Sequence, residues 1–109
     1  MTNTKQREQL AVTSPFNGDV LNTIPMQNLD DANAMLASAN ALFRNKTAWL
    51  AHHERAAILK KLASLVEDEG EQFALLIAQE GGKPIMDARV EVARAIGGIL
   101  LAVKKVLKN

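Results

Sequence analysis

The chain has 109 residues, of which 13 are Lys or Arg and 12 are Asp or Glu, so its formal net charge is +1. This near balance argues against a nucleic-acid-binding protein, which concentrates basic charge on one face. The absence of cysteine excludes disulfides, thiolate zinc sites and a cysteine nucleophile within these residues.

A β-hairpin is predicted near the start of the chain, with strands over residues 10–13 and 19–24. Between them lies the segment SPFNG, in which Pro presets the backbone of a turn and Asn-Gly supplies positive φ. Pro25 is expected to end the second strand because it cannot donate to a ladder. An isolated hairpin is marginal in water, so this one is expected to pack on another element or to join a larger sheet.

The period of the sequence changes after the hairpin, and four helices are predicted, over residues 29–44, 53–67, 71–79 and 85–107. Asn28 is a good N-cap for the first helix, and Asp31 completes a capping-box pattern three residues later. The segment DEG at 68–70 separates the second helix from the third, and EGGKP at 80–84 ends the third. The predicted fold class is therefore mainly α with a short N-terminal β-hairpin.

Each predicted helix has an apolar face with three/four spacing. In the first helix that face comprises Ala32, Met35, Leu36, Ala39, Leu42 and Phe43, with Trp49 and Leu50 expected to cover the helix end. The second is expected to bury Ile58, Leu59, Leu62, Leu65 and Val66, and the third Phe73, Leu76 and Ile77.

The fourth helix is expected to turn Ile85, Ala88, Val92 and Ile96 inward and to turn Asp87, Arg89, Glu91 and Arg94 mostly outward. Its second half, residues 96–103, is apolar nearly all round. A helix that is apolar on every side is normally buried on every side, and three short helices and a hairpin are too few to surround it.

No catalytic and no cofactor-binding residue is predicted. The GK pair at 82–83 is not a phosphate-binding loop, because that loop needs a Gly and a Ser or Thr where this chain has Ile77 and Pro84. The sequence contains no G-x-G-x-x-G dinucleotide fingerprint, and the HE pair at 53–54 lacks the second His that a zinc-protease helix requires. Taken alone, the residues indicate a helical protein without an active site.

No targeting or membrane segment is predicted either. Residues 1–9 are polar and lack the apolar stretch of a secretory signal. The longest apolar run covers residues 95–103, whereas a membrane span needs about 20 residues. We therefore expect a cytoplasmic protein with neither nucleic acid nor a membrane as a partner.

Several segments together resemble the opening of aldehyde dehydrogenases: SPFNGDV at 14–20, HERAAIL at 53–59, LLIAQEGGKP at 75–84 and ARVEVARA at 88–95. The resemblance covers roughly residues 12–103 and implies the N-terminal portion of the aldehyde-dehydrogenase α/β fold. It implies an enzyme that converts an aldehyde to an acid with NAD or NADP. In that family a cysteine attacks the aldehyde, a hydride passes to the nicotinamide, a glutamate activates water and an asparagine stabilises the oxyanion. All these groups lie downstream of the region matched here.

The resemblance therefore implies a chain that is inactive alone, that binds neither NAD nor NADP alone, and whose aldehyde substrate binds only the full-length enzyme. Residues 1–109 are expected to be a single N-terminal segment without a catalytic domain, with a polar tail and hairpin arm over 1–28 and a four-helix region over 29–109. The expected partner is the remainder of the dehydrogenase polypeptide or a second copy. The alternative is a standalone helical interaction module that self-associates through its apolar C-terminal helix.

One site of the family is expected to be present in part. Many members bind a monovalent cation through backbone groups near the first strand and a carboxylate on the helix after Gly-Lys-Pro. By position, Val12, Thr13 and Glu91 match, and carbonyl and carboxylate oxygens suit such an ion. The alternative interpretation is that Glu91 is an exposed helix charge, and the site would need a later backbone ligand as well.

Overall fold

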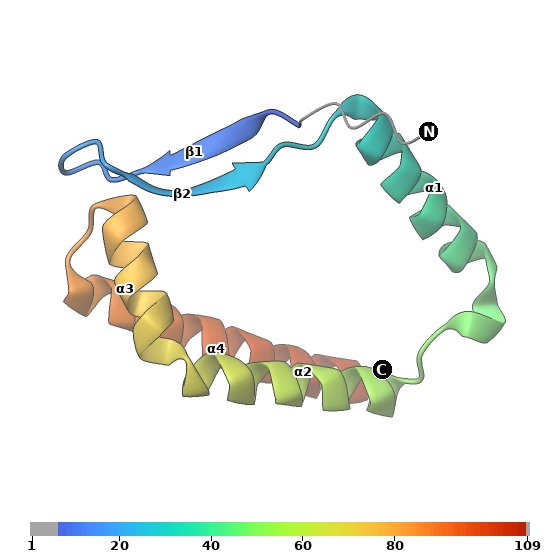
Figure 1. The fold of residues 1–109 in the computed structure, drawn as a ribbon. Helices are drawn as coiled ribbons and strands as arrows, with labels where there is room; N and C mark the ends of the chain where they lie inside the picture. Colours follow the sequence, from blue (N-terminus) through green and yellow to red (C-terminus); the bar gives the residue numbers. More distant parts are fainter. Residues whose placement is uncertain (1–6, 109) are drawn as a thin grey trace. The chain divides into compact units, whose positions relative to one another are not determined.

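The computed structural model describes residues 7–108, and contacts between residues divide it into two units. The first unit contains residues 7–13 and 18–49, and the second contains residues 14–17 and 50–108. Figure 1 shows the elements in chain order. Each unit is described by itself.

The first unit opens with the predicted hairpin. Strands β1 (Gln9–Thr13) and β2 (Val20–Pro25) pair antiparallel, with an irregularity of register between Val12 and Thr13. Pro25 is the last residue of β2, opposite Gln9, so the strand ends at this proline as predicted. A proline is tolerated at this outermost position, where the next donor, the Met26 N–H, reaches the Glu8 carbonyl at 2.7 Å.

Helix α1 (Leu29–Arg44) begins where it was predicted to begin. The Asn28 side chain accepts from the Asp31 N–H at 2.9 Å, and the Asp31 side chain accepts from the Asn28 N–H at 2.9 Å, which confirms the capping box. A short 3-10 helix, η1 (Lys46–Ala48), follows. Trp49 then covers the helix end as predicted: its ring centroid lies 5.7 Å from that of Phe43, and its Nε1 donates to the Leu42 carbonyl at 3.1 Å.

The apolar face of α1 is not buried in this structure. No residue of α1 is buried, and Leu36 and Phe43 are 68% and 67% exposed. The three/four spacing was predicted correctly, but within the described part of the first unit only a hairpin and one 3-10 turn accompany the helix. The face is therefore formed without an element that covers it.

The second unit consists mainly of three helices, α2 (His52–Asp68), α3 (Gly70–Gly81) and α4 (Ile85–Lys108). Helix α4 packs along both α2 and α3. The break between α2 and α3 is only Glu69, which is shorter than the three residues predicted, because Asp68 and Gly70 both remain helical. Gly82 ends α3 in the left-handed conformation (φ 65°), as predicted for a glycine at this position.

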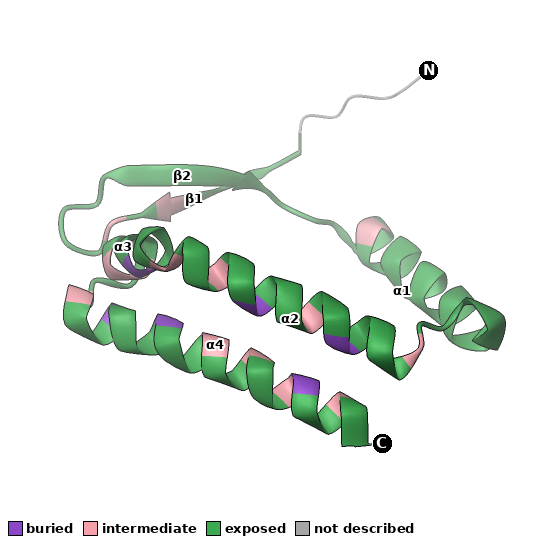
Figure 2. Ribbon diagram, turned by 90° about the horizontal axis from the view of Figure 1, so that it is seen from below, coloured by how far each residue is buried: buried purple, intermediate pink, exposed green. Residues whose placement is uncertain are grey.

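The core of the second unit is made of small residues, and Figure 2 marks the buried positions of α2, α3 and α4 in purple. The buried residues are Ala56, Ala63, Ala74, Ala88, Val92 and Val103. The inward face of α4 was predicted correctly: Ala88 and Val92 are buried, and Ile85 and Ile96 pack against them half-buried.

The predicted buried stripes of α2 and α3 were wrong in part. In α2, Leu59 and Val66 are half-buried but Ile58, Leu62 and Leu65 are exposed; in α3, Ile77 is half-buried but Phe73 and Leu76 are exposed. The reason is that each helix turns its alanines toward the neighbouring helix, which permits close approach, so that the larger side chains remain outside. The predicted excess of apolar surface on α4 is confirmed, because Leu100, Leu101 and Leu107 are exposed. No helix within residues 7–108 combines the length and the hydropathy that crossing a membrane requires.

Candidate functional site

Glu91 is the predicted cation ligand that the second unit contains. It lies exposed on α4, and its Oε1 accepts a hydrogen bond from the Lys83 ammonium, in the turn that precedes the helix. A metal cation at this carboxylate would compete with the ammonium of Lys83. Glu91 is therefore not an isolated helix charge but one half of an ion pair.

Val12 and Thr13, the other predicted cation ligands, lie on β1 in the first unit. Val12 is half-buried and Thr13 is exposed, and the irregularity of the β1–β2 register falls between these two residues. Among residues 7–108 no three His, Cys, Asp or Glu side chains are grouped so as to hold a metal ion. The partial site formed by Val12, Thr13 and Glu91 stays a prediction.

The turn between α3 and α4 holds Lys83 in place through Gly82. A Cβ built on Gly82 would lie 2.7 Å from Cγ of Pro15, which belongs to the same unit. Since the backbone of Gly82 also has positive φ, the position disfavours other residues on two separate grounds. The GK pair therefore has a structural explanation that needs no bound phosphate.

A second polar contact of this unit joins α3 to α4. Arg89 donates from Nε and Nη2 to the two carboxylate oxygens of Glu71, at 3.1 and 2.7 Å. This hydrogen-bonded guanidinium lowers the pKa of Glu71 below its ordinary value. From the sequence, Arg89 was predicted only to point outward. Its pairing with Glu71 was not predicted, because no local pattern connects residues that are 18 positions apart.

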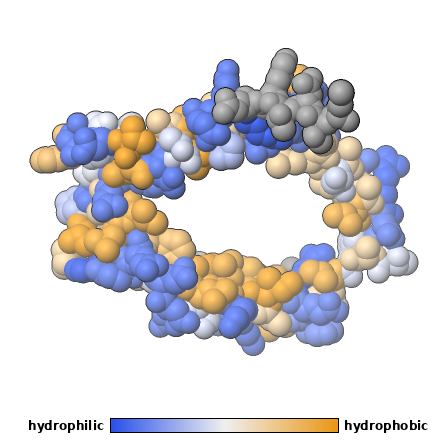
Figure 3. Space-filling view, in the orientation of Figure 1, coloured by the Kyte–Doolittle hydropathy of each residue, from blue (hydrophilic) through white to orange (hydrophobic). Residues whose placement is uncertain are grey.

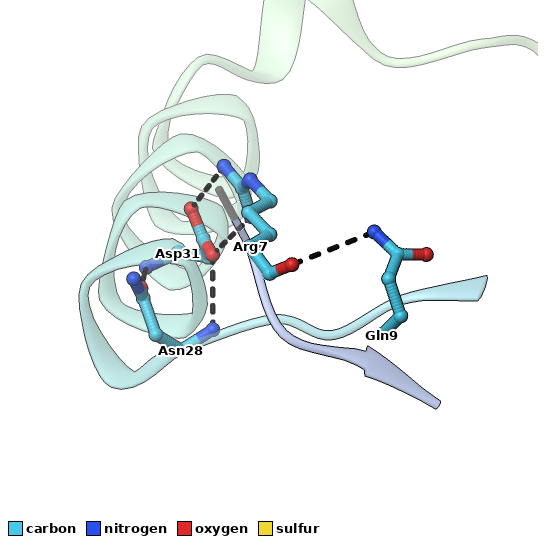
Figure 4. Close-up of polar contacts among 4 residues, drawn as sticks. All are labelled: Arg7, Gln9, Asn28 and Asp31. Carbon is cyan, nitrogen blue, oxygen red and sulfur yellow. Dashed lines mark hydrogen bonds and ion pairs between the residues drawn. The ribbon is translucent and has the colours of Figure 1, made fainter. Parts of the chain in front are cut away.

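The corresponding contact of the first unit links Arg7, two residues before β1, to the first turn of α1 (Figure 4). Arg7 donates from Nη1 and Nη2 to the two carboxylate oxygens of Asp31, at 2.5 and 3.1 Å. The pKa of Asp31 is lowered chiefly by this hydrogen bond and secondarily by the bond from the Asn28 N–H. The contact was not predicted from the sequence, because the two residues are 24 positions apart.

Apolar depressions mark the surface of the second unit, where Figure 3 shows apolar side chains gathered over α2 and α3. One, of about 480 Å³, is lined by Ala57, Ile58, Lys61, Leu62 and Leu65. Another, of about 180 Å³, is lined by Val66, Phe73, Ile77, Glu91, Val92 and Ala95. Neither lining fits a dinucleotide, whose phosphates require a glycine-rich turn opening onto a helix N-terminus.

Comparison with known proteins identifies the family of this chain. Residues 1–108 match the sequence model of the aldehyde dehydrogenase family. The chain belongs to the aldehyde dehydrogenase family. The family resemblance stated from the sequence is thereby confirmed.

Two curated dehydrogenase relatives show how much of such a protein is represented. An aldehyde-dehydrogenase-like protein of Sinorhizobium fredii is 34% identical over 92% of this chain and 19% of its own length. The NADP+-dependent succinate-semialdehyde dehydrogenase of Escherichia coli is 36% identical over 81% of this chain and 18% of its own length. The chain thus spans about a fifth of the length of these aldehyde dehydrogenase relatives.

Solved aldehyde dehydrogenases confirm the fold class, mainly α with a short N-terminal hairpin, as that of the family's N-terminal region. Aldehyde dehydrogenase 21 of Physcomitrella patens, in complex with the product succinate, matches 95% of this chain with a TM-score of 0.89 and 30% identity. A glyceraldehyde-3-phosphate dehydrogenase of Methanocaldococcus jannaschii, complexed with NADP, matches 90% with a TM-score of 0.81 and 32% identity. The chain covers 21% of each of these structures.

Proposed function

We propose that this chain is the N-terminal segment of an NAD(P)+-dependent aldehyde dehydrogenase that oxidises an aldehyde to a carboxylic acid, and that the segment is inactive alone. The observation that carries the proposal is the match of residues 1–108 to the family together with a span of only about a fifth of the relatives' length. The NADP dependence of one relative and the NADP in one solved structure support the cofactor class.

The remainder of the dehydrogenase polypeptide is the proposed partner of this segment. The exposed side chains of Ile58, Leu62 and Leu65 form an apolar row on α2, at helical spacing i, i+4 and i+7. Apolar area removed from water stabilises a fold by about 25 cal/mol per Å², so a row of this kind favours association with further apolar surface. The nucleophile, the base and the nicotinamide site would come from that partner.

The alternative function is a helical module that self-associates through α4. The observation that favours it is the exposure of Leu100, Leu101 and Leu107, at 45%, 57% and 54%, near the end of this helix. An exposed apolar patch marks a surface for a second copy as readily as one for another domain. The two proposals differ in what covers the exposed apolar side chains: the rest of the dehydrogenase polypeptide in the first, and a second copy of the chain in the alternative.

Two measurements distinguish these proposals. The coding sequence downstream of Asn109 is expected to continue into an open reading frame that encodes a cysteine-bearing catalytic segment. The purified 109-residue chain, supplied with NAD+ or NADP+ and a panel of aldehydes, is expected to form no NADH or NADPH, whereas the continued polypeptide forms it. Turnover by the 109-residue chain would contradict the proposal, and a stop codon together with a defined dimer in solution would support the module.

We also propose that Val12, Thr13 and Glu91 contribute to a monovalent-cation site in the continued polypeptide. The support is the position of these residues relative to the family's ligands and the exposed carboxylate of Glu91 on α4. The test is thermal unfolding of the continued polypeptide in sodium, in potassium and in a bulky organic cation. A cation-dependent shift that is lost in Glu91→Gln and kept in the control Glu67→Gln supports the site, and equal melting in all three salts rejects it.

A further inference from the structure

The hairpin turn contains a dipeptide with a chemistry that neither the fold nor the proposed function uses. Asn17-Gly18 is the one place in the sequence where an asparagine precedes a glycine. Asparagine is among the thermolabile residues, because the main-chain nitrogen that follows it can attack its side-chain carbonyl carbon. The rate of that attack depends on how freely the following residue can approach.

We infer that Asn17 is a site of spontaneous deamidation, through a cyclic imide formed with the main chain of Gly18. The nitrogen of Gly18 bonds to Cγ of Asn17, the Cγ–Nδ2 bond breaks, and ammonia leaves with the proton that the Gly18 nitrogen gives up. Water then opens the ring at either carbonyl and yields aspartate or isoaspartate. One water is consumed and one ammonia released, with no oxidation or reduction.

The geometry at Gly18 favours this step. Asn17 and Gly18 are both exposed, and they lie in the connection between the two strands, whose last pair is Thr13 with Val20. A Cβ built on Gly18 would meet no atom within 4 Å, so nothing packs against this glycine on the side where other residues carry a side chain. Its φ of 78° lies where glycine moves without steric cost, which permits the rotation that ring closure needs.

Asn22 supplies a comparison within the same hairpin. It is also exposed, but it lies within β2 and precedes Thr23, whose branched Cβ obstructs the approach of the main-chain nitrogen. The Thr23 N–H donates to Oδ1 of Asn22 at 2.8 Å, and the strand holds this arrangement. Exposure is thus shared by the two asparagines, whereas the steric hindrance at the residue that follows differs.

Conversion has a defined electrostatic and covalent result. A neutral amide becomes a carboxylate, so the formal net charge falls from +1 to 0, and the new charge lies two residues from Asp19. The isoaspartate product also routes the main chain through Cβ, which lengthens the turn by one methylene. The pairing of Thr13 with Val20 is the first that this change would loosen.

The test uses the full chain, incubated at mildly alkaline pH in a buffer without denaturant and sampled over time. Tryptic peptides are followed by mass spectrometry for the mass gain of an amide-to-acid conversion, and isoaspartate is labelled by an isoaspartyl methyltransferase. We expect isoaspartate at Asn17 and faster conversion there than at any other asparagine. The signal should disappear in Asn17→Gln and slow in Gly18→Ala.

A synthetic peptide of residues 10–24 fixes the unfolded rate and makes the result decisive. Conversion at Asn17 in both the chain and the peptide, with Asn22 unchanged over the same time, supports the inference. If the peptide converts while the chain keeps the amide of Asn17 intact, the turn protects the residue and the inference is overturned. Formation of aspartate without isoaspartate would overturn the imide route, because direct hydrolysis gives aspartate alone.

Discussion

The two units of the chain differ in the contacts that stabilise each of them internally. In the described part of the first unit no residue is buried, and its contacts are directional: a capping box, a two-pronged ion pair and the bond from the Trp49 indole. The second unit has a small apolar core, in which Ala74, Ala88 and Val92 form a cluster between α3 and α4. The difference shows that one family segment combines structure held by directional polar contacts with structure that depends on helix packing.

Both units leave large apolar side chains exposed, but for different reasons. In the first, the described hairpin and 3-10 turn of the same unit do not bury the apolar face of α1. In the second, alanines occupy the helix contacts and the leucines remain outside. Alanine contributes only one methyl group, and burial stabilises by about 0.8 kcal/mol per methylene-sized group, so this core is a modest one. Substitutions in the two units should therefore differ in kind and in size.

The largest effect is expected for Ala88→Asp. Ala88 is fully buried, and an unpaired charge placed there should cost about 3–5 kcal/mol, enough to unfold the second unit. Far-ultraviolet circular dichroism during heating measures the loss of helix. The control, Ala93→Asp, changes an exposed residue on the same helix and should melt close to the wild type. Equal melting of Ala88→Asp and Ala93→Asp would show that the small core does not hold the second unit together.

The next effect is expected for Gly82→Ala. The added Cβ meets Pro15 at 2.7 Å and a backbone with positive φ, for which the left-handed conformation alone costs about 1–2 kcal/mol. The matched change is Gly97→Ala in the interior of α4, where nothing lies within 4 Å and the better helix former should stabilise by about 0.5–1 kcal/mol. Urea unfolding measures both, and shifts of the same sign would contradict this explanation of Gly82.

In the first unit the corresponding change is Asn28→Ala, which removes the N-cap of α1. Loss of such a cap costs about 1 kcal/mol, and we expect it as faster amide exchange in the first turn of α1. The control Asn33→Ala lies inside the same helix and replaces a weaker helix former, so it should leave exchange in that turn unchanged or slower. Equal protection in the Asn28→Ala variant and the wild type would show that other contacts fix the helix start.

The sequence predicted the local structure better than the packing. The hairpin, the Asn28 cap, the Gly82 stop and the inward face of α4 all follow from residues close together in the chain, and the structure confirms them. Which side of α2 is buried does not follow in that way, because an amphipathic helix with Ala56 and Ala63 beside Leu62 can pack on either row. Which row of α2 is buried depends on how closely α4 approaches α2, and this distance is set by both helices together.

In the candidate site, too, local features were predicted from the sequence but long-range contacts were not. The predicted cation-ligand role of Glu91 came from the family resemblance and stays a prediction, whereas its ion pair with Lys83 depends on the turn that follows the left-handed Gly82. The ion pairs Arg7–Asp31 and Arg89–Glu71 join residues 24 and 18 positions apart, and no local pattern predicts such partners. Long-range pairs of this kind become visible only once the elements have been placed.

The smallest effect on stability is expected on acidification, through protonation of the Asp31 carboxylate in the first unit. Asp31 has a folded pKa below its ordinary value of 3.8, so between the two values the unfolded chain binds more protons than the folded one. Its contribution is therefore fully present above about pH 4 and is lost as the pH falls through the folded pKa. Nuclear magnetic resonance titration of the Asp31 carboxyl should show this lowered pKa, and Arg7→Gln should raise it. In Asp30→Asn, where the Arg7–Asp31 contact is kept, the Asp31 titration should be almost unchanged. An Asp31 pKa that Arg7→Gln leaves in place would assign the shift to the Asn28 N–H instead, and the first unit would then depend on its cap alone.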